Sequence, residues 1–225
     1  NLHNAVNTSG QLDPEAIAQV IENSGAEIVA MQEVSRGWLT WGGMDMLSWL
    51  ANRLNMYYVW GPTADPQWGN AVFSKYPIES YELGDLPPED VLLLRGYISA
   101  EIDLGADSLQ VIATHFVHRE EQGPERLQQS SAILSAWNQE ERTIFMGDLN
   151  ALPDAEEVAL LIENGLIDIS REIGEQPVYT YYADHPDHQI DYIFVSPDLG
   201  YSDFEVLQSS ASDHLPLVAT IYLNP

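Results

Sequence analysis

The sequence of 225 residues contains no cysteine, which excludes disulfides, thiolate metal ligands and cysteine nucleophiles. Any metal site must therefore use carboxylates, amides or histidines. The chain also has no apolar run close to the roughly 18 residues that span a bilayer. Stretches such as Leu215 to Ile221 are short and are interrupted by proline or polar residues. We therefore expect no transmembrane helix within this sequence.

Basic residues are scarce. Lys75 is the single lysine, and with seven arginines it opposes 35 acidic residues, which gives a formal net charge of −27. Because this charge repels a phosphate backbone, polymeric DNA or RNA is disfavoured as a partner. Arg36, Arg95 and Arg119 are the cations nearest in sequence to the candidate functional residues and could clamp a phosphate. We expect them to form salt bridges with the surplus carboxylates instead.

The sequence has no internal repeat, low-complexity tract or glycine/serine linker, so we expect a single domain over residues 1–225. The apolar periodicity switches between values typical of strands and of helices. It predicts helices over 14–24, 44–54, 125–137 and 156–163, and strands over 28–34, 57–60, 71–74, 97–104, 109–114, 143–146, 190–195 and 217–222. Several strands follow one another without a helix, which favours hairpins and a layered α+β sandwich over a doubly wound parallel sheet.

Polar residues of catalytic type stand where apolar strands begin or end. They are Glu33, His115, Asp148, Asn150, Asp191, Asp213 and His214. A single carboxylate at a strand end often only binds loop amides. Because strand ends converge on one rim of a sheet, however, the whole set indicates a catalytic site. The motifs of serine hydrolases, phosphate-binding loops, dinucleotide-binding folds and zinc proteases are absent.

These residue types meet the needs of phosphoester hydrolysis, which requires an activated water, positive charge on the non-bridging oxygens and a stabilised leaving group. Glu33 could supply an oxygen ligand to Mg²⁺. His214 could act as an acid or a base that is oriented by Asp213 or by another aspartate. Asn150 would lie on the same side as Asp148 if the strand conformation continued, and could then fix a water or a phosphoryl oxygen.

Seven motifs follow one another along the chain: NLHN at 1–4, MQEV at 31–34, WGNAVFSKYPI at 68–78, ATHF at 113–116, MGDLNA at 146–151, IDYIFVS at 190–196 and SDHLPL at 212–217. Together they resemble the endonuclease/exonuclease/phosphatase superfamily of DNase I-like enzymes. The resemblance covers essentially the whole chain. It implies a four-layer α/β/β/α sandwich and Mg²⁺-dependent cleavage of a phosphoester, with Mn²⁺ or Ca²⁺ as substitute ions.

The resemblance also implies a role for each matching residue. His214, partnered by Asp191, would contact the scissile phosphate. Asp148 would activate or orient the water, and Asn150 would position it. His115 would stabilise the phosphoryl oxygens.

The metal and substrate residues are implied in the same way. Glu33 would be the metal ligand with Asn1 nearby, and Asp213 would support the metal or its waters. Asn70 and Trp68 would bind the substrate, in a region where Trp38, Trp41 and Trp68 are expected in loops with at least one of them facing the substrate. Superfamily members usually have an apolar strand before the asparagine of the first motif, so we expect a truncated N-terminus or a missing sheet edge here.

Residues 35–55 and 57–78 are most similar to the soluble domain of membrane proteins linked to lipid remodelling of glycosylphosphatidylinositol anchors, and to bacterial relatives of that domain. This similarity implies a lipid head group or small phosphoester as substrate. It also implies an extracytoplasmic domain of a secreted or membrane-anchored parent protein. Separately, we expect a monomer. Two alternatives stay open at this point: a nuclease, which should carry a basic groove, and a binding module that kept the fold and lost its activity.

Overall fold

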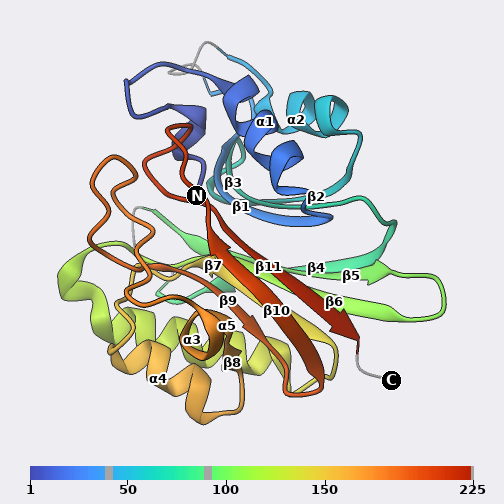
Figure 1. Cartoon of the computed structure of the whole chain (residues 1–225), viewed down its shortest axis with the longest axis vertical. Coiled ribbons are helices and arrows are strands. Elements are labelled where there is room, and N and C mark those ends of the chain that lie inside the picture. Colours follow the sequence, from blue (N-terminus) through green and yellow to red (C-terminus); the bar gives the residue numbers. More distant parts are fainter. Residues whose placement is uncertain (39–42, 89–92, 224–225) are drawn as a thin grey trace.

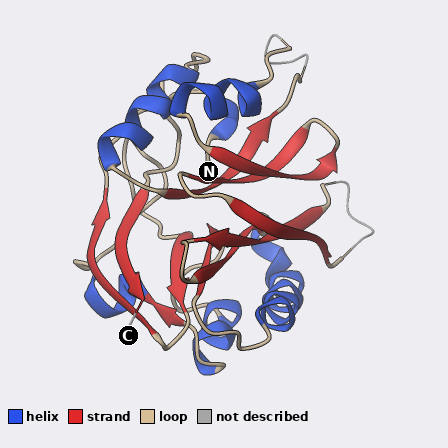
Figure 2. Ribbon diagram, turned by 90° about the vertical axis from the view of Figure 1, so that its right-hand side faces the viewer, coloured by secondary structure: helices blue, strands red, loops and turns tan. Residues whose placement is uncertain are grey.

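Four layers build the molecule in the computed structural model, which describes residues 1–38, 43–88 and 93–223. Two helices, α1 (Pro14–Ser24) and α2 (Met46–Leu54), cover one sheet, while α3 (Gly123–Trp137) and α4 (Glu156–Glu163) cover the other (Figure 1). The two sheets face each other between these helical layers (Figure 2). The predicted α/β/β/α sandwich is therefore confirmed.

Eleven strands are formed by the described residues: β1 (Ile28–Ser35), β2 (Tyr57–Asp65), β3 (Trp68–Ser74), β4 (Ile78–Leu86), β5 (Arg95–Asp103), β6 (Ser108–His115), β7 (Thr143–Asp148), β8 (Ile167–Asp168), β9 (Asp191–Val195), β10 (Leu199–Val206) and β11 (Leu217–Leu223). The short helices are η1 (His3–Ala5), η3 (Glu120–Gln122) and α5 (Ile169–Ile173). Among the described helices, none is long and apolar enough to cross a membrane.

The larger sheet has six strands in the order β4-β5-β6-β7-β9-β8. Within it, β4, β5 and β6 pair antiparallel, β6 and β7 pair parallel, and β7 and β9 pair antiparallel. The facing layer contains a sheet of order β1-β3-β2 and a separate β10-β11 pair. The antiparallel pairs β2–β3, β4–β5 and β5–β6 each join consecutive strands, which confirms the hairpin-rich α+β arrangement.

Three apolar cores hold the four layers together. One packs α1 and α2 on β1 and β3 through residues such as Leu47 and Phe73. A second lies between the two sheets and includes Val72 and Val111. The third packs the six-stranded sheet on α3 and α4 through Phe145 and similar side chains. Burial of apolar surface in these interfaces is the main force that fixes the position of the strand ends.

β1 lies at the edge of its sheet, where β3 is its neighbour among the described strands. A cavity of about 520 Å³ occupies this region and is lined mainly by side chains of α1, β1, β9 and β11. At one end the cavity reaches Asn1, Asp191 and His214. Asn1, Asp191 and His214 therefore lie where this cavity meets the end of the six-stranded sheet.

Helix boundaries follow from local chemistry. Asp13 accepts a hydrogen bond from the backbone N–H of Ala16, Pro14 occupies the first turn of α1, and Gly25 ends the helix with φ 72°.

Strand β4 is not among the strands that the apolar periodicity of the sequence predicts. Most of its residues are exposed, so no alternation of apolar and polar residues marks this strand in the sequence.

Candidate active site

Three candidate residues stand side by side because their strands pair at the same end of the six-stranded sheet. His115 ends β6 and is in register with Asp148 at the end of β7, and Asp148 is in register with Asp191 at the start of β9. The residue before Asp148 must be glycine, since a Cβ on Gly147 would lie 2.4 Å from the backbone oxygen of Thr114. The close approach of β6 and β7 thus fixes the position of Asp148.

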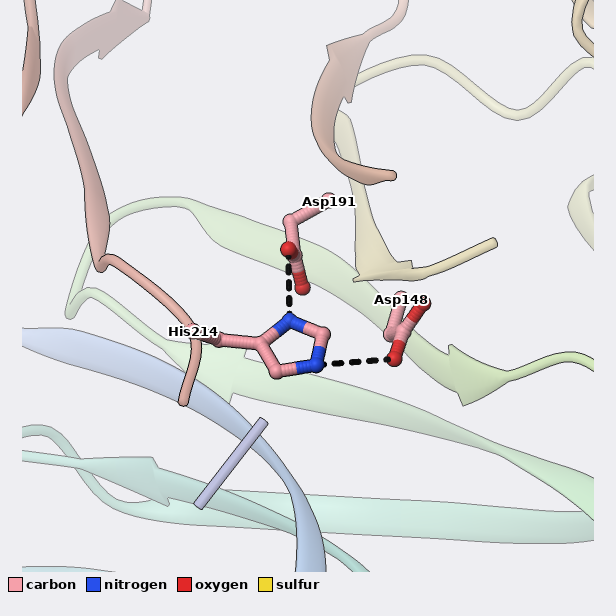
Figure 3. Close-up of side chains that lie close together, drawn as sticks. All are labelled: Asp148, Asp191 and His214. Atoms are coloured by element: carbon pink, nitrogen blue, oxygen red, sulfur yellow. Dashed lines mark hydrogen bonds and ion pairs between the residues drawn. The ribbon is translucent and has the colours of Figure 1, made fainter. Parts of the chain in front are cut away.

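His214 lies between the two aspartates, as Figure 3 shows. Its Nδ1 is 2.8 Å from Asp191 Oδ2, and its Nε2 is 3.8 Å from Asp148 Oδ2. All three residues are buried. The ring of Tyr181 covers the imidazole with 4.7 Å between the centroids. The predicted pairing of His214 with Asp191 rather than Asp213 is the one that the structure contains.

Opposite charges control the protonation of this pair. Burial lowers the pKa of His214, but the charge of Asp191 and its hydrogen bond outweigh burial, so the pKa is raised overall. Burial raises the pKa of Asp191, but the charge and hydrogen bond of His214 lower it below its ordinary value. The pair is therefore an aspartate that orients an imidazole and favours its protonated form.

Asp148 is the focus of the site. Its Oδ2 accepts a hydrogen bond of 3.0 Å from Asn1 Nδ2 and lies 3.4 Å from His115 Nε2. Burial, and next the charge of Asp191, raise the pKa of Asp148 to about 6. Such a carboxylate can both accept and release a proton near neutral pH, as a general base must.

His115 has a different partner from His214. Its Nδ1 lies 3.3 Å from Nη1 of Arg95, the first residue of β5. Burial, and next the charge of Arg95, hold the pKa of His115 well below its usual value. His115 is therefore a neutral imidazole at physiological pH, which suits a hydrogen-bond donor rather than a charge carrier.

Glu33 lies at an irregularity of β1 that turns its side chain towards Asn1. The register of β1 with β3 shifts between Met31 and Val34, and Glu33 itself has a φ of 55°. A left-handed residue in a bulged strand is strained backbone, which concentrates at functional sites. Asn1 Nδ2 and Asn4 Nδ2 each lie 3.4 Å from a carboxylate oxygen of Glu33.

The residues around Glu33 fit a hard divalent cation. Asn4 is buried, and its Oδ1 has no hydrogen-bond partner among the described residues. A carboxylate with amide oxygens and room for water is the donor set that Mg²⁺ prefers. Asp148, Asp191 and His214 also offer ligand atoms within 4.8 Å of one another, close enough to share an ion. Because Nδ1 of His214 is already engaged by Asp191, we assign that group to proton transfer.

The structure gives the local contacts of three further candidate residues, of which Asn150 departs from the strand conformation that was considered for it. Asn150 does not continue β7: its φ is 49°, its backbone N–H donates to Asp148 Oδ1, and its side chain donates to the Phe116 carbonyl. Asp213 lies near His3, with 3.7 Å between its Oδ1 and His3 Nδ1. Asn70 is buried and donates to the backbone oxygen of Gly96, which ties the two sheets together beneath the site.

The tryptophans correct another expectation. Trp68 is not in a loop but begins β3, where it is buried, and its ring centroid is 6.1 Å from that of His115. Trp38 stacks on Trp68 at 6.1 Å and is partly exposed, so it is the member of the pair that a substrate could touch. Trp41 lies outside the described residues.

Sequence reasoning missed the roles of Asn4, Tyr181 and Arg95. Asn4 belongs to the NLHN motif, so its place in that motif was a signal that could have been used. Arg95 was expected in a salt bridge, yet within the part of the chain that the structure describes it forms none; it contacts His115 and Trp68 instead. Tyr181 is far from His214 in sequence, and no pattern marks their contact.

Comparison with known proteins identifies the family of this chain. Residues 5–214 match the Endonuclease/Exonuclease/phosphatase family. The chain belongs to this family. Members of the endonuclease/exonuclease/phosphatase family are mostly hydrolytic phosphoesterases that use divalent metals. Among curated proteins, the uncharacterised protein YbhP of Escherichia coli K12 is 26% identical over 92% of this chain and 87% of its own length.

Solved structures share the fold at lower identity. An endonuclease/exonuclease/phosphatase from Beutenbergia cavernae superposes with a TM-score of 0.87 and 22% identity over 99% of this chain and 70% of that one. The mannosyl-6-phosphatase Bt3783 of Bacteroides thetaiotaomicron gives a TM-score of 0.77 with 18% identity, over 93% of this chain and 90% of that one. These likenesses establish the fold of the family and leave the substrate to be argued from the site.

Proposed function

We propose that this family member is a Mg²⁺-dependent phosphoester hydrolase that acts on a lipid head group or a small phosphoester. The observation that carries the proposal is the position of Asp148, whose Oδ2 lies within 4 Å of nitrogens on Asn1, His115 and His214. One carboxylate surrounded by two histidines and an amide can take a proton from water while its neighbours donate to phosphoryl oxygens.

The hydrolysis divides among these side chains. Asp148 accepts a proton from the attacking water as the new P–O bond forms. His214, whose protonated form is favoured by Asp191, donates its Nε2 proton to the leaving oxygen as the old P–O bond breaks. Transfer of a proton from Asp148 to His214 then restores both groups. Asn1 and His115 donate hydrogen bonds to the non-bridging oxygens.

Glu33, with the amides of Asn1 and Asn4, would hold the divalent cation, and Asp213 would support its waters. When bound, the cation supplies positive charge to the phosphoryl oxygens. This charge is important in an acidic chain, because it lets an anionic ester approach carboxylates that would otherwise repel it.

The distribution of cations favours a small or lipid phosphoester over a nucleic acid. Arg36, Arg53, Arg126 and Arg142 are ion-paired with carboxylates away from the site. A nuclease of this family would need cations along its cleft to neutralise successive phosphates. We also propose, from the sequence similarity alone, an extracytoplasmic domain that contacts membrane through its parent protein. Separately, we propose a monomer.

The test is product release from a panel that contains inositol phospholipid, sphingomyelin, small phosphomonoesters, bis-p-nitrophenyl phosphate and plasmid DNA. Activity should require Mg²⁺, disappear with EDTA, return with added Mg²⁺, and be lost in His214→Ala and Glu33→Gln. His185→Ala is the matched control, because His185 is an exposed histidine paired with Asp184. Release from lipid or small esters supports the proposal.

Two other outcomes would overturn it. Preferential cutting of DNA would make the protein a nuclease and would mean that the net charge is a poor guide to its substrate. Absence of turnover together with absence of Mg²⁺ binding in calorimetry would instead indicate a binding module that retains the fold.

A further inference from the structure

Arg95 is a buried cation beside the candidate active site. Arg95 is only 4% exposed. Within residues 1–38, 43–88 and 93–223, no carboxylate forms an ion pair with it. In a chain with 35 acidic residues, an arginine without such a partner requires an explanation. Burying a charge costs free energy unless other contacts compensate for the lost water.

Two rings provide those contacts. The guanidinium carbon lies 5.4 Å from the ring centroid of Trp68, in cation–π contact. Trp38 stacks on the same indole. The second ring is His115, whose Nδ1 is 3.3 Å from Nη1 of Arg95. Trp68 therefore holds the guanidinium in a fixed orientation towards a single acceptor.

This contact determines where the proton of His115 resides. A guanidinium can only donate hydrogen bonds, so Nδ1 must be the acceptor and cannot carry a proton. In a neutral imidazole the single proton is then on Nε2, the atom that lies 3.4 Å from Asp148 Oδ2. The opposite tautomer would direct the lone pair of Nε2 at a carboxylate oxygen and leave two N–H donors facing each other.

We propose that Arg95 is a positioning residue that locks His115 as the Nε2–H tautomer, so that a neutral ring donates one hydrogen bond into the site. Its use for a phosphoryl oxygen rests on the proposed function, but the tautomer itself does not. An imidazole locked in this way cannot accept a proton at Nε2. It therefore cannot compete with Asp148 for the proton of the attacking water.

The tautomer can be measured without any substrate. Long-range ¹H–¹⁵N NMR of the full chain at pH 7.5 distinguishes protonated from unprotonated ring nitrogens, and His115→Phe assigns the signal. We expect a protonated Nε2 and an unprotonated Nδ1 in the wild type. Arg95→Gln, which keeps an N–H donor, should preserve this pattern, while Arg95→Met should lose it. Arg142→Met, which removes an exposed arginine that is paired with Asp107, is the control.

Two results would overturn the proposal: protonated Nδ1 in the wild type, or an unchanged tautomer in Arg95→Met. If Arg95→Met does not fold, the wild-type spectrum and Arg95→Gln still decide. These spectra are informative even if no ester is hydrolysed, so failure of the proposed function and failure of the tautomer lock are distinguishable.

Turnover provides a second test, once a substrate is known. Loss of an orienting partner typically costs roughly 10- to 100-fold, so we expect kcat of Arg95→Met to fall by that factor while Arg95→Gln retains most activity. If Arg95 acts through His115, the double variant Arg95→Met/His115→Phe should be no slower than His115→Phe alone. Additive losses in the double variant would contradict the proposal.

Discussion

Two histidines approach Asp148, and both have Nε2 near its Oδ2, at 3.4 Å for His115 and 3.8 Å for His214. They differ in what lies behind the ring. Asp191 faces Nδ1 of His214, whereas Arg95 faces Nδ1 of His115. Asp191 accepts a hydrogen bond and carries a negative charge, whereas Arg95 donates a hydrogen bond and carries a positive charge.

This difference gives the same residue type two chemical states. Both rings are buried, and burial lowers the pKa of each. The charge of Asp191 reverses the effect at His214, while the charge of Arg95 adds to it at His115. One ring is therefore suited to transfer a proton, and the other is suited to donate a hydrogen bond without changing charge.

The largest expected effect separates the two rings directly. His214→Gln removes a proton donor that an amide cannot replace, so kcat for phosphoester release should fall roughly 10²- to 10⁴-fold. His115→Gln keeps an N–H donor and should cost at most about tenfold, well below the loss that follows removal of an oxyanion donor. Steady-state kinetics of both variants measure the contrast. Equal losses would show that the rings are not divided in this way.

Replacing the partner behind His214 should have the next largest effect. Asp191→Asn removes the charge that raises the pKa of His214, and the pKa of this histidine should therefore fall. As a result, the basic limb of the pH–rate profile should move to lower pH, and kcat should drop roughly 100-fold. NMR titration of His214 gives an independent measurement. An unchanged titration midpoint would contradict the assignment of Asp191 as its partner.

The same variant should alter the pH dependence of stability. Because the pKa of His214 is raised in the folded state, its contribution is fully present below about pH 6.5 and is lost as pH rises through the folded-state pKa. This dependence should weaken in Asp191→Asn. Thermal melting across this pH range, with His185→Ala as control, measures the change.

The smallest expected effect is a change in thermal stability, and it concerns the carboxylate of Asp148. The pKa of Asp148 is raised from 3.8 to about 6, so its ionised form costs stability that develops between these pH values and persists above them. Asp148→Asn removes this cost while it abolishes activity. Its Tm should exceed that of wild type by at least about 2 °C at pH 7.5, and the gain should vanish near pH 4. A gain independent of pH would indicate another cause.

Much of this arrangement was predictable because it is local. The cap at Asp13, the proline in the first turn and the terminal Gly25 fix α1 within the helix itself. The runs that became β6, β7 and β9 are apolar and end or begin in polar residues, so the clustering of His115, Asp148 and Asp191 could be expected before the register was known. Exposed strands such as β4 carry no such pattern and were not predicted.

The misplaced predictions share a cause, since each depends on neighbours that are distant in sequence. Asn150 leaves the strand conformation, and its side chain donates a hydrogen bond to the carbonyl of Phe116, 34 residues earlier in the chain. Trp68 is buried because β3 pairs with both β1 and β2 in the middle of its sheet. Neither the helical turn nor the strand alternation of a short segment contains this information.

The residue types of the site, their order along the chain and their family could be read from the sequence alone, because motifs and caps are short-range features. The chemical state of each residue depends on contacts that form when the chain folds. A pKa or a tautomer depends on burial and on the charge a few ångströms away, so the two histidines differ because Asp191 contacts one ring and Arg95 contacts the other.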